Sequence, residues 1–108
     1  MKKNIKLEVE LDDKNLPINI VVNSTDGELE GDIKALMFSV WSSKKKETLR
    51  LDLWTKDMLL EEMFIMYYQT MLGMAESLER STGKYKLAGA LRDYCSFFSE
   101  ETNILKNK

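Results

Sequence analysis

Few residues of this chain could carry enzyme chemistry, and those present are badly spaced for it. Histidine is absent, which removes the usual general base and every Ser-His-Asp or Cys-His arrangement. The single cysteine, Cys95, lies on an apolar stripe, where a thiol is typically structural and unreactive. Carboxylates are neighbours at 61–62 and 100–101, but adjacent helical residues point about 100° apart and do not converge. We therefore expect no catalytic residue and no enzyme activity.

Patterns that bind metals or phosphates are missing as well. The acidic turn STDGELEGD contains Gly27, but aligning this glycine with a calcium-binding EF-hand loop places Val22 and Ile33 where oxygen ligands are needed. The five glycines are scattered and form no phosphate-binding loop. The basic run 44–46 lies at an expected hairpin tip, and in an acidic chain it is a weak electrostatic footprint. The sequence predicts no metal site and no cofactor.

Length and charge are those of a small globular protein. The 108 residues are 44% hydrophobic and 31% charged, which suits a single domain over residues 1–108. A net charge of −2 argues against binding to nucleic acid or to an anionic membrane surface, since proteins bind both through Lys and Arg. There is one cysteine, no signal-peptide pattern and no apolar stretch of about 18 residues. We expect a cytoplasmic protein with no direct membrane insertion.

The first half of the chain alternates apolar and polar residues with a period of two, as half-buried strands do. Four strands are predicted, around residues 5–11, 18–22, 36–40 and 48–54, with Pro17 at the start of the second strand and a turn over 12–15. The segment NSTDGELEGD, rich in turn formers, is predicted to be irregular. The polar connection SSKKKE predicts a hairpin between the last two strands.

The second half changes to a helical period. Asp57 is a plausible cap for a helix that runs to about Arg80, with Gly83 as its stop. Its apolar residues fall on one stripe: Leu60, Met63, Phe64, Tyr67, Met71, Met74, Ala75 and Leu78. A second helix is predicted from about Lys86 to Leu105, with an apolar stripe made of Leu87, Leu91, Tyr94, Cys95, Phe98 and Leu105.

Strands followed by helices indicate an α+β fold, and the short connections favour an antiparallel sheet. We predict one four-stranded antiparallel sheet, with the two C-terminal helices packed on one face. Ile65, Tyr68 and Leu72 lie off the main stripe of the first helix, where they could pack against the second helix or face a partner chain. Five of the seven methionines lie between residues 58 and 74, which suits core filling and also an adaptable binding surface.

The outward face of the predicted sheet holds the candidate site. Alternation places Trp41, Arg50, Asp52 and Trp54 on this face. Exposed tryptophans beside Arg and Asp are a common composition of protein interfaces. The alternative is that both rings pack on loops or on the bent end of the sheet. The interface interpretation makes these four residues the candidate partner-binding surface.

The segment Glu47–Met58, ETLRLDLWTKDM, resembles the most recognisable segment of the gliding motility protein GldC family. The preceding SVW at 39–41, the Asp26–Gly27 pair and RDYC at 92–95 with its following phenylalanines also resemble that family. Two features depart from it. Leu59 and Leu60 stand where family members tend to have proline and valine, and Gly27 stands where a glycine pair is common.

The resemblance implies a cytoplasmic accessory component of gliding motility, with no catalytic residues to transfer. On this basis we expect a non-enzymatic adaptor that binds another protein of the motility or secretion machinery, as a dimer or higher oligomer. The predicted order of strands and helices also resembles the SecB export chaperone. A chaperone that holds unfolded or export-bound chains is therefore the alternative expectation.

Overall fold

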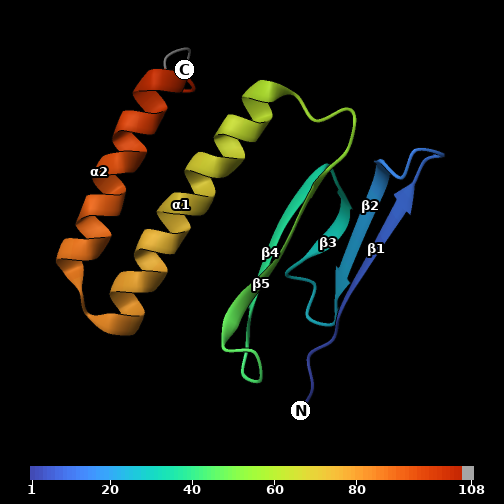
Figure 1. The fold of residues 1–108 in the computed structure, drawn as a ribbon, viewed down its shortest axis with the longest axis horizontal. Coiled ribbons are helices and arrows are strands. Elements are labelled where there is room, and N and C mark those ends of the chain that lie inside the picture. Colours follow the sequence, from blue (N-terminus) through green and yellow to red (C-terminus); the bar gives the residue numbers. More distant parts are fainter. Residues whose placement is uncertain (106–108) are drawn as a thin grey trace. The chain divides into compact units, whose positions relative to one another are not determined.

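The computed structural model describes residues 1–105 and contains five strands followed by two helices (Figure 1). The strands are β1 (Ile5–Leu11), β2 (Pro17–Ser24), β3 (Glu30–Ile33), β4 (Ala35–Ser42) and β5 (Glu47–Trp54). The helices are α1 (Leu60–Thr82) and α2 (Tyr85–Thr102). The chain divides into two compact units, Met1–Met58 with the strands and Leu59–Lys108 with the helices. The α+β fold class is therefore confirmed.

The prediction of a single four-stranded sheet is wrong. The strands form two antiparallel sheets, one with the order β1-β2-β3 and one with the order β4-β5. The additional strand, β3, lies in the segment predicted to be irregular, and it pairs with β2 through Ile20–Ile33 and Val22–Gly31. Because β3 occupies this edge of β2 and only Lys34 separates β3 from β4, the hairpin of β4 and β5 forms its own sheet. Packing of both helices on one face of a sheet stays a prediction.

Burial in the three-stranded sheet is concentrated on one side of β2. Leu7 pairs with Val22 and Val9 with Ile20, so the apolar residues of β1 and β2 share one side of their sheet. Ile20, on the central strand, is 0% exposed, and Val22 is also buried. Leu36 of β4 is buried as well. The core of the strand unit therefore lies beneath the central strand β2.

The predicted turn after β1 is confirmed and is built around Asp12. The Asp12 carboxylate accepts hydrogen bonds from the backbone N–H groups of Lys14 (2.8 Å) and Leu16 (3.0 Å). Asn15 has a φ of 64°, a left-handed conformation that asparagine tolerates better than most residues. The same carboxylate forms an ion pair with the Lys56 ammonium. Asp12 thus connects the β1–β2 turn to the segment that follows β5.

Replacing Asp12 with Asn should give a stability loss that depends on pH. The Lys56 ammonium and the backbone N–H groups hold the pKa of Asp12 at about 2, below its ordinary value of 3.8. A lowered folded-state pKa stabilises the fold above the ordinary value, and this contribution disappears as the pH falls toward the folded-state pKa. We expect the Tm difference between wild type and Asp12→Asn to shrink from pH 5 to pH 2. A Tm difference that stays constant over this range would contradict the ion-pair account.

Helix α1 begins two residues later than a cap at Asp57 would require, so that prediction is wrong. Leu59 is the N-cap residue, and its backbone N–H donates to the Glu62 carboxylate at 3.0 Å. Asp57 instead accepts a hydrogen bond from the Thr55 hydroxyl at 2.7 Å. The predicted stop is confirmed: Gly83 has a φ of 72° and donates its N–H to the Glu79 carbonyl at 2.8 Å.

The two helices pack through small residues. Ala75 of α1 and Ala88 of α2 are both 0% exposed, and Cys95 is 1% exposed. Aromatic side chains also contribute to the contact between the helices. The Phe64 and Phe98 rings pack edge to face with their centroids 6.1 Å apart. The Cys95 thiol is therefore buried in the helix contact, as the sequence predicts. Helix α2 ends at Thr102, three residues short of the predicted end.

All three off-stripe residues of α1 are half-buried, and two of them, Tyr68 and Leu72, locate this side of the helix. They precede Ala75 by seven and three residues, so they lie on the side of α1 that carries Ala75. On the same side, Glu79 accepts a hydrogen bond from the Arg92 guanidinium of α2 at 2.7 Å. This arrangement favours the alternative in which the off-stripe residues pack against the second helix.

Candidate functional site

The pairing of β4 with β5 places all four candidate residues on one side of the hairpin. Trp41 lies opposite Thr48, and Trp54 lies opposite Ala35. Arg50 and Asp52 are on β5 between these two positions and share their parity. We call this side, which carries Trp41, Arg50, Asp52 and Trp54, the tryptophan face. Their shared location is the one that the alternation of the sequence predicts.

A fixed polar cluster lies at the middle of the tryptophan face. The Arg50 guanidinium donates to the Ser39 hydroxyl at 2.6 Å and to both carboxylate oxygens of Asp52, at 2.8 and 3.0 Å. A bidentate pair of this kind fixes the plane of the guanidinium. Sequence reasoning missed the role of Ser39 as a partner of Arg50. The hairpin register, in which these two residues are directly opposite, is the signal that would have found it.

The tryptophans mark the two ends of this face. Trp41 is 65% exposed and Trp54 is 36% exposed. Trp41 is six positions along β4 from Ala35, and Ala35 lies opposite Trp54. The two ring positions are therefore about 20 Å apart along the strands. The face therefore offers two separated aromatic groups with a neutral, internally bonded ion pair between them. It has the composition of a binding surface.

The opposite side of the same hairpin is apolar and forms a shallow groove with β1. Phe38 pairs with Leu51 and Val40 pairs with Leu49, and Leu7 of β1 joins these four residues in lining the groove. All five side chains are exposed although they are apolar. This groove is a second candidate surface, and Arg50 is the one polar residue among those that line it.

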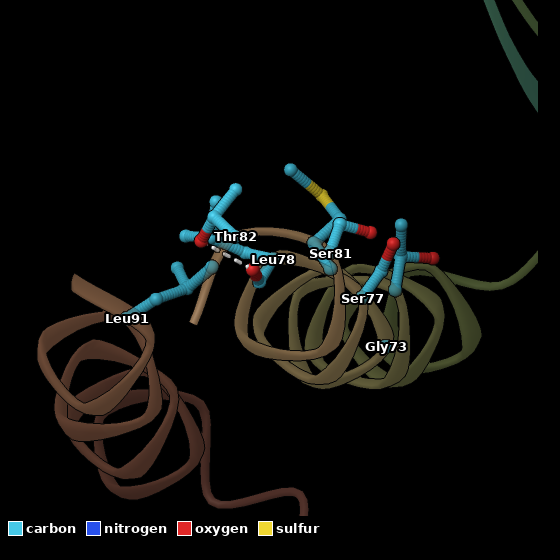
Figure 2. Close-up of a pocket in the computed structure, with 8 residues that line it drawn as sticks. Gly73, Ser77, Leu78, Ser81, Thr82 and Leu91 are labelled. Atoms are coloured by element: carbon cyan, nitrogen blue, oxygen red, sulfur yellow. Dashed lines mark hydrogen bonds between the residues drawn. The ribbon is translucent and has the colours of Figure 1, made fainter. Parts of the chain in front are cut away.

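The helical unit contains a hollow along α1 (Figure 2). Figure 2 shows Leu91 of α2 reaching toward Leu78 and Thr82 of α1, whose hydroxyl donates to the Leu78 carbonyl at 2.7 Å. Ser77 and Ser81 add further hydroxyl groups to the lining. None of the lining residues is a carboxylate, a thiol or a lysine, so the hollow does not provide an acid–base site.

Metal sites and membrane-spanning segments are two further features that would define a function. Within residues 1–105, no three acidic or thiol side chains come close enough together to hold a metal ion. Neither of the two helices in this part of the chain is long and apolar enough to cross a membrane. The tryptophan face is the surface with the most specific arrangement of side chains, because Arg50 bonds to both Ser39 and Asp52.

Comparisons with known proteins agree with the sequence resemblance. The family model of the gliding motility-associated protein GldC-like family matches residues 17–104, from the start of β2 past the end of α2. The comparisons found no similar curated protein and no similar solved structure. A match over this much of the chain includes both strands of the tryptophan face. The chain belongs to the GldC-like family of gliding motility-associated proteins.

Proposed function

We propose that this GldC-like protein is a non-enzymatic adaptor of the gliding motility machinery. It acts in the cytoplasm, as a dimer or higher oligomer, by binding another protein of the motility or secretion machinery. Family membership supports the link to motility. The partner binds the tryptophan face, and it has to present apolar pockets for two rings on either side of a polar centre.

The observation that carries this proposal is the arrangement of the tryptophan face. Trp and Arg are the residue types most enriched among side chains that dominate binding energy. Here Arg50 is held by Ser39 and Asp52 before any partner arrives, so little side-chain entropy remains to be lost on binding. The charges of Arg50 and Asp52 already compensate one another. A partner therefore needs no opposing charge to cover this centre.

Affinity capture from the native cell tests the adaptor proposal. The tagged chain is used as bait, and the captured proteins are identified by mass spectrometry. We expect one dominant partner from the motility or secretion machinery, with binding that saturates at a fixed stoichiometry. Recovery of only ribosomal or random unfolded chains would contradict the adaptor function.

A chaperone that holds unfolded chains is the second candidate, because the groove on the opposite side of the hairpin exposes apolar side chains. Phe38, Val40 and Leu51 would contact apolar segments of many sequences without polar selection. A holder of this kind suppresses the aggregation of several unrelated unfolded proteins. An adaptor leaves their aggregation unchanged, so light scattering with and without the chain separates the two functions.

A further inference from the structure

Strand β5 has an edge that pairs with no other strand of the described chain. Across residues 1–105, β5 pairs with β4 and with no other strand. Seven of its eight residues are exposed, Leu53 being the exception. Its sequence, ETLRLDLW, contains no proline, no glycine and no irregularity in its register with β4. Exposed edge strands usually contain prolines, glycines or irregularities, because these features prevent pairing with another chain.

The sequence of β5 is complementary to itself when two copies run antiparallel. Pairing centred on Leu51 sets Leu51 opposite Leu51, Leu49 opposite Leu53, and Arg50 opposite Asp52 of the other copy. Opposite charges in directly opposed positions stabilise a sheet, and so do matched apolar pairs. Because the pairing is symmetric, the contact between Arg50 and Asp52 occurs twice.

We propose that β5 is a homodimer interface, in which it pairs antiparallel with β5 of a second copy in the register centred on Leu51. Each copy already holds Arg50 beside its own Asp52 at 2.8 Å. In the dimer these four groups form a ring of alternating charge. The paired hairpins form one continuous sheet with the strand order β4-β5-β5-β4. The proposal extends the proposed function by naming the surface through which the oligomer forms.

The other registers and edges of the strand unit fit less well. A one-residue shift would set apolar side chains opposite polar ones and exchange the two faces. A two-residue shift would place Arg50 directly opposite Arg50, and like charges in opposed positions destabilise the pairing. Strand β1 has an irregular register at Glu10 and Leu11, and β3 contains only four residues. The second edge of β4 is also unpaired within residues 1–105, but its sequence, ALMFSVWS, has no charged side chain that would fix a register. Charge complementarity therefore selects β5 and one of its registers.

The dimer also completes the tryptophan face. In one copy, Trp41 lies opposite Thr48. In the proposed register, Thr48 lies opposite Trp54 of the second copy. Neighbouring strands are about 4.8 Å apart, so these two tryptophans come within about 10 Å of each other across Thr48. Within one copy their positions are about 20 Å apart along the strands. Pairing through β5 thus brings the aromatic groups together around the charge ring.

Cysteine cross-linking tests the register. In antiparallel strands, opposed Cα atoms lie about 4.5–5.5 Å apart, within the range of a disulfide. Leu51→Cys should therefore form a disulfide-linked dimer under mild oxidation. Leu49→Cys alone should not, because its two copies lie about 13 Å apart, whereas an equal mixture of Leu49→Cys and Leu53→Cys should link. Wild type is the control, since Cys95 is buried and should not react.

Charge reversal tests the same contact without a covalent bond. Arg50→Asp and Asp52→Arg each place like charges opposite one another, and each should raise the dimer Kd about tenfold or more. Mixing the two variants restores both complementary contacts, so the mixture should dimerise again. Arg80→Asp and Asp93→Arg on the helices change the net charge equally and should leave the dimer intact. Sedimentation equilibrium measures all of these species.

Two results would overturn the proposal. The first is a wild-type chain that remains monomeric at about 100 μM, which is a generous concentration for a specific homodimer. The second is a dimer in which Leu51→Cys does not link and neither charge variant weakens association. Neither result bears on the capture of a motility partner, so failure of the interface is distinguishable from failure of the adaptor function.

Discussion

Replacing both Trp41 and Trp54 with alanine should weaken binding of the captured partner by about 30-fold or more. Truncating an aromatic residue that a partner buries typically costs more than about 1 kcal/mol, and two such losses, about 2 kcal/mol together, correspond to about 30-fold in Kd. Trp41 is among the most exposed side chains of the strand unit, so its removal costs the folded chain little. Surface plasmon resonance with the captured partner measures the change in Kd.

The matched control for this experiment removes two exposed aromatic rings elsewhere. Tyr85→Ala combined with Phe97→Ala does this on α2, and it should leave the Kd within about twofold of wild type. Circular dichroism and sedimentation establish that both double variants fold and keep their oligomeric state. If the tryptophan double variant passes these checks and still supports motility and partner capture, the surface assignment is wrong.

Ile20→Ala should lower the free energy of unfolding by about 2–5 kcal/mol, the usual cost of truncating a fully buried isoleucine. Ile20 is 0% exposed and lies on the central strand between Val9 and Ile33. A small sheet has few other buried side chains that could compensate. Urea denaturation followed by tryptophan fluorescence reports on this unit directly, because both tryptophans are in its strands.

Ile18→Ala is the control on the same strand, because the Ile18 side chain is exposed. It should change the free energy of unfolding by less than about 1 kcal/mol. Equal losses for the two variants would mean that β2 does not form the core of the strand unit.

The sequence predicted four strands well because each is a clear local pattern. Alternation, the Pro17 start and the turn at Asp12 all act within a few residues of one another. β3 was not predicted because its four residues are too few to show alternation. They include Gly31 and the acidic residues Glu30 and Asp32, which are uncommon in strands. Its formation depends on pairing with β2, which is a contact between segments distant in sequence. The division into two sheets follows from that same distant contact, so local patterns could not reveal it.

The candidate site was predictable in composition but not in detail. Alternation alone assigns Trp41 and Arg50 to one side of a hairpin. The bond from Arg50 to Ser39 depends on the register of two strands, which the loop between them fixes. The start of α1 was also missed because it depends on side-chain hydrogen bonds. The Glu62 carboxylate accepts the Leu59 N–H, and Asp57 accepts a hydrogen bond from Thr55 and does not cap the helix. In each case several polar groups near in sequence could have formed the hydrogen bond. Which of them does so depends on distances that only the folded structure sets.

Fluorine NMR of the two tryptophans tests the central claim most directly. The chain has two tryptophans, both on the tryptophan face, so incorporating 5-fluorotryptophan labels this surface and no other part of the protein. We predict that both resonances shift when the captured unlabelled partner is added, and that their solvent isotope shift decreases as the rings become buried. Unchanged resonances at a partner concentration that saturates binding would place the partner elsewhere and contradict the account.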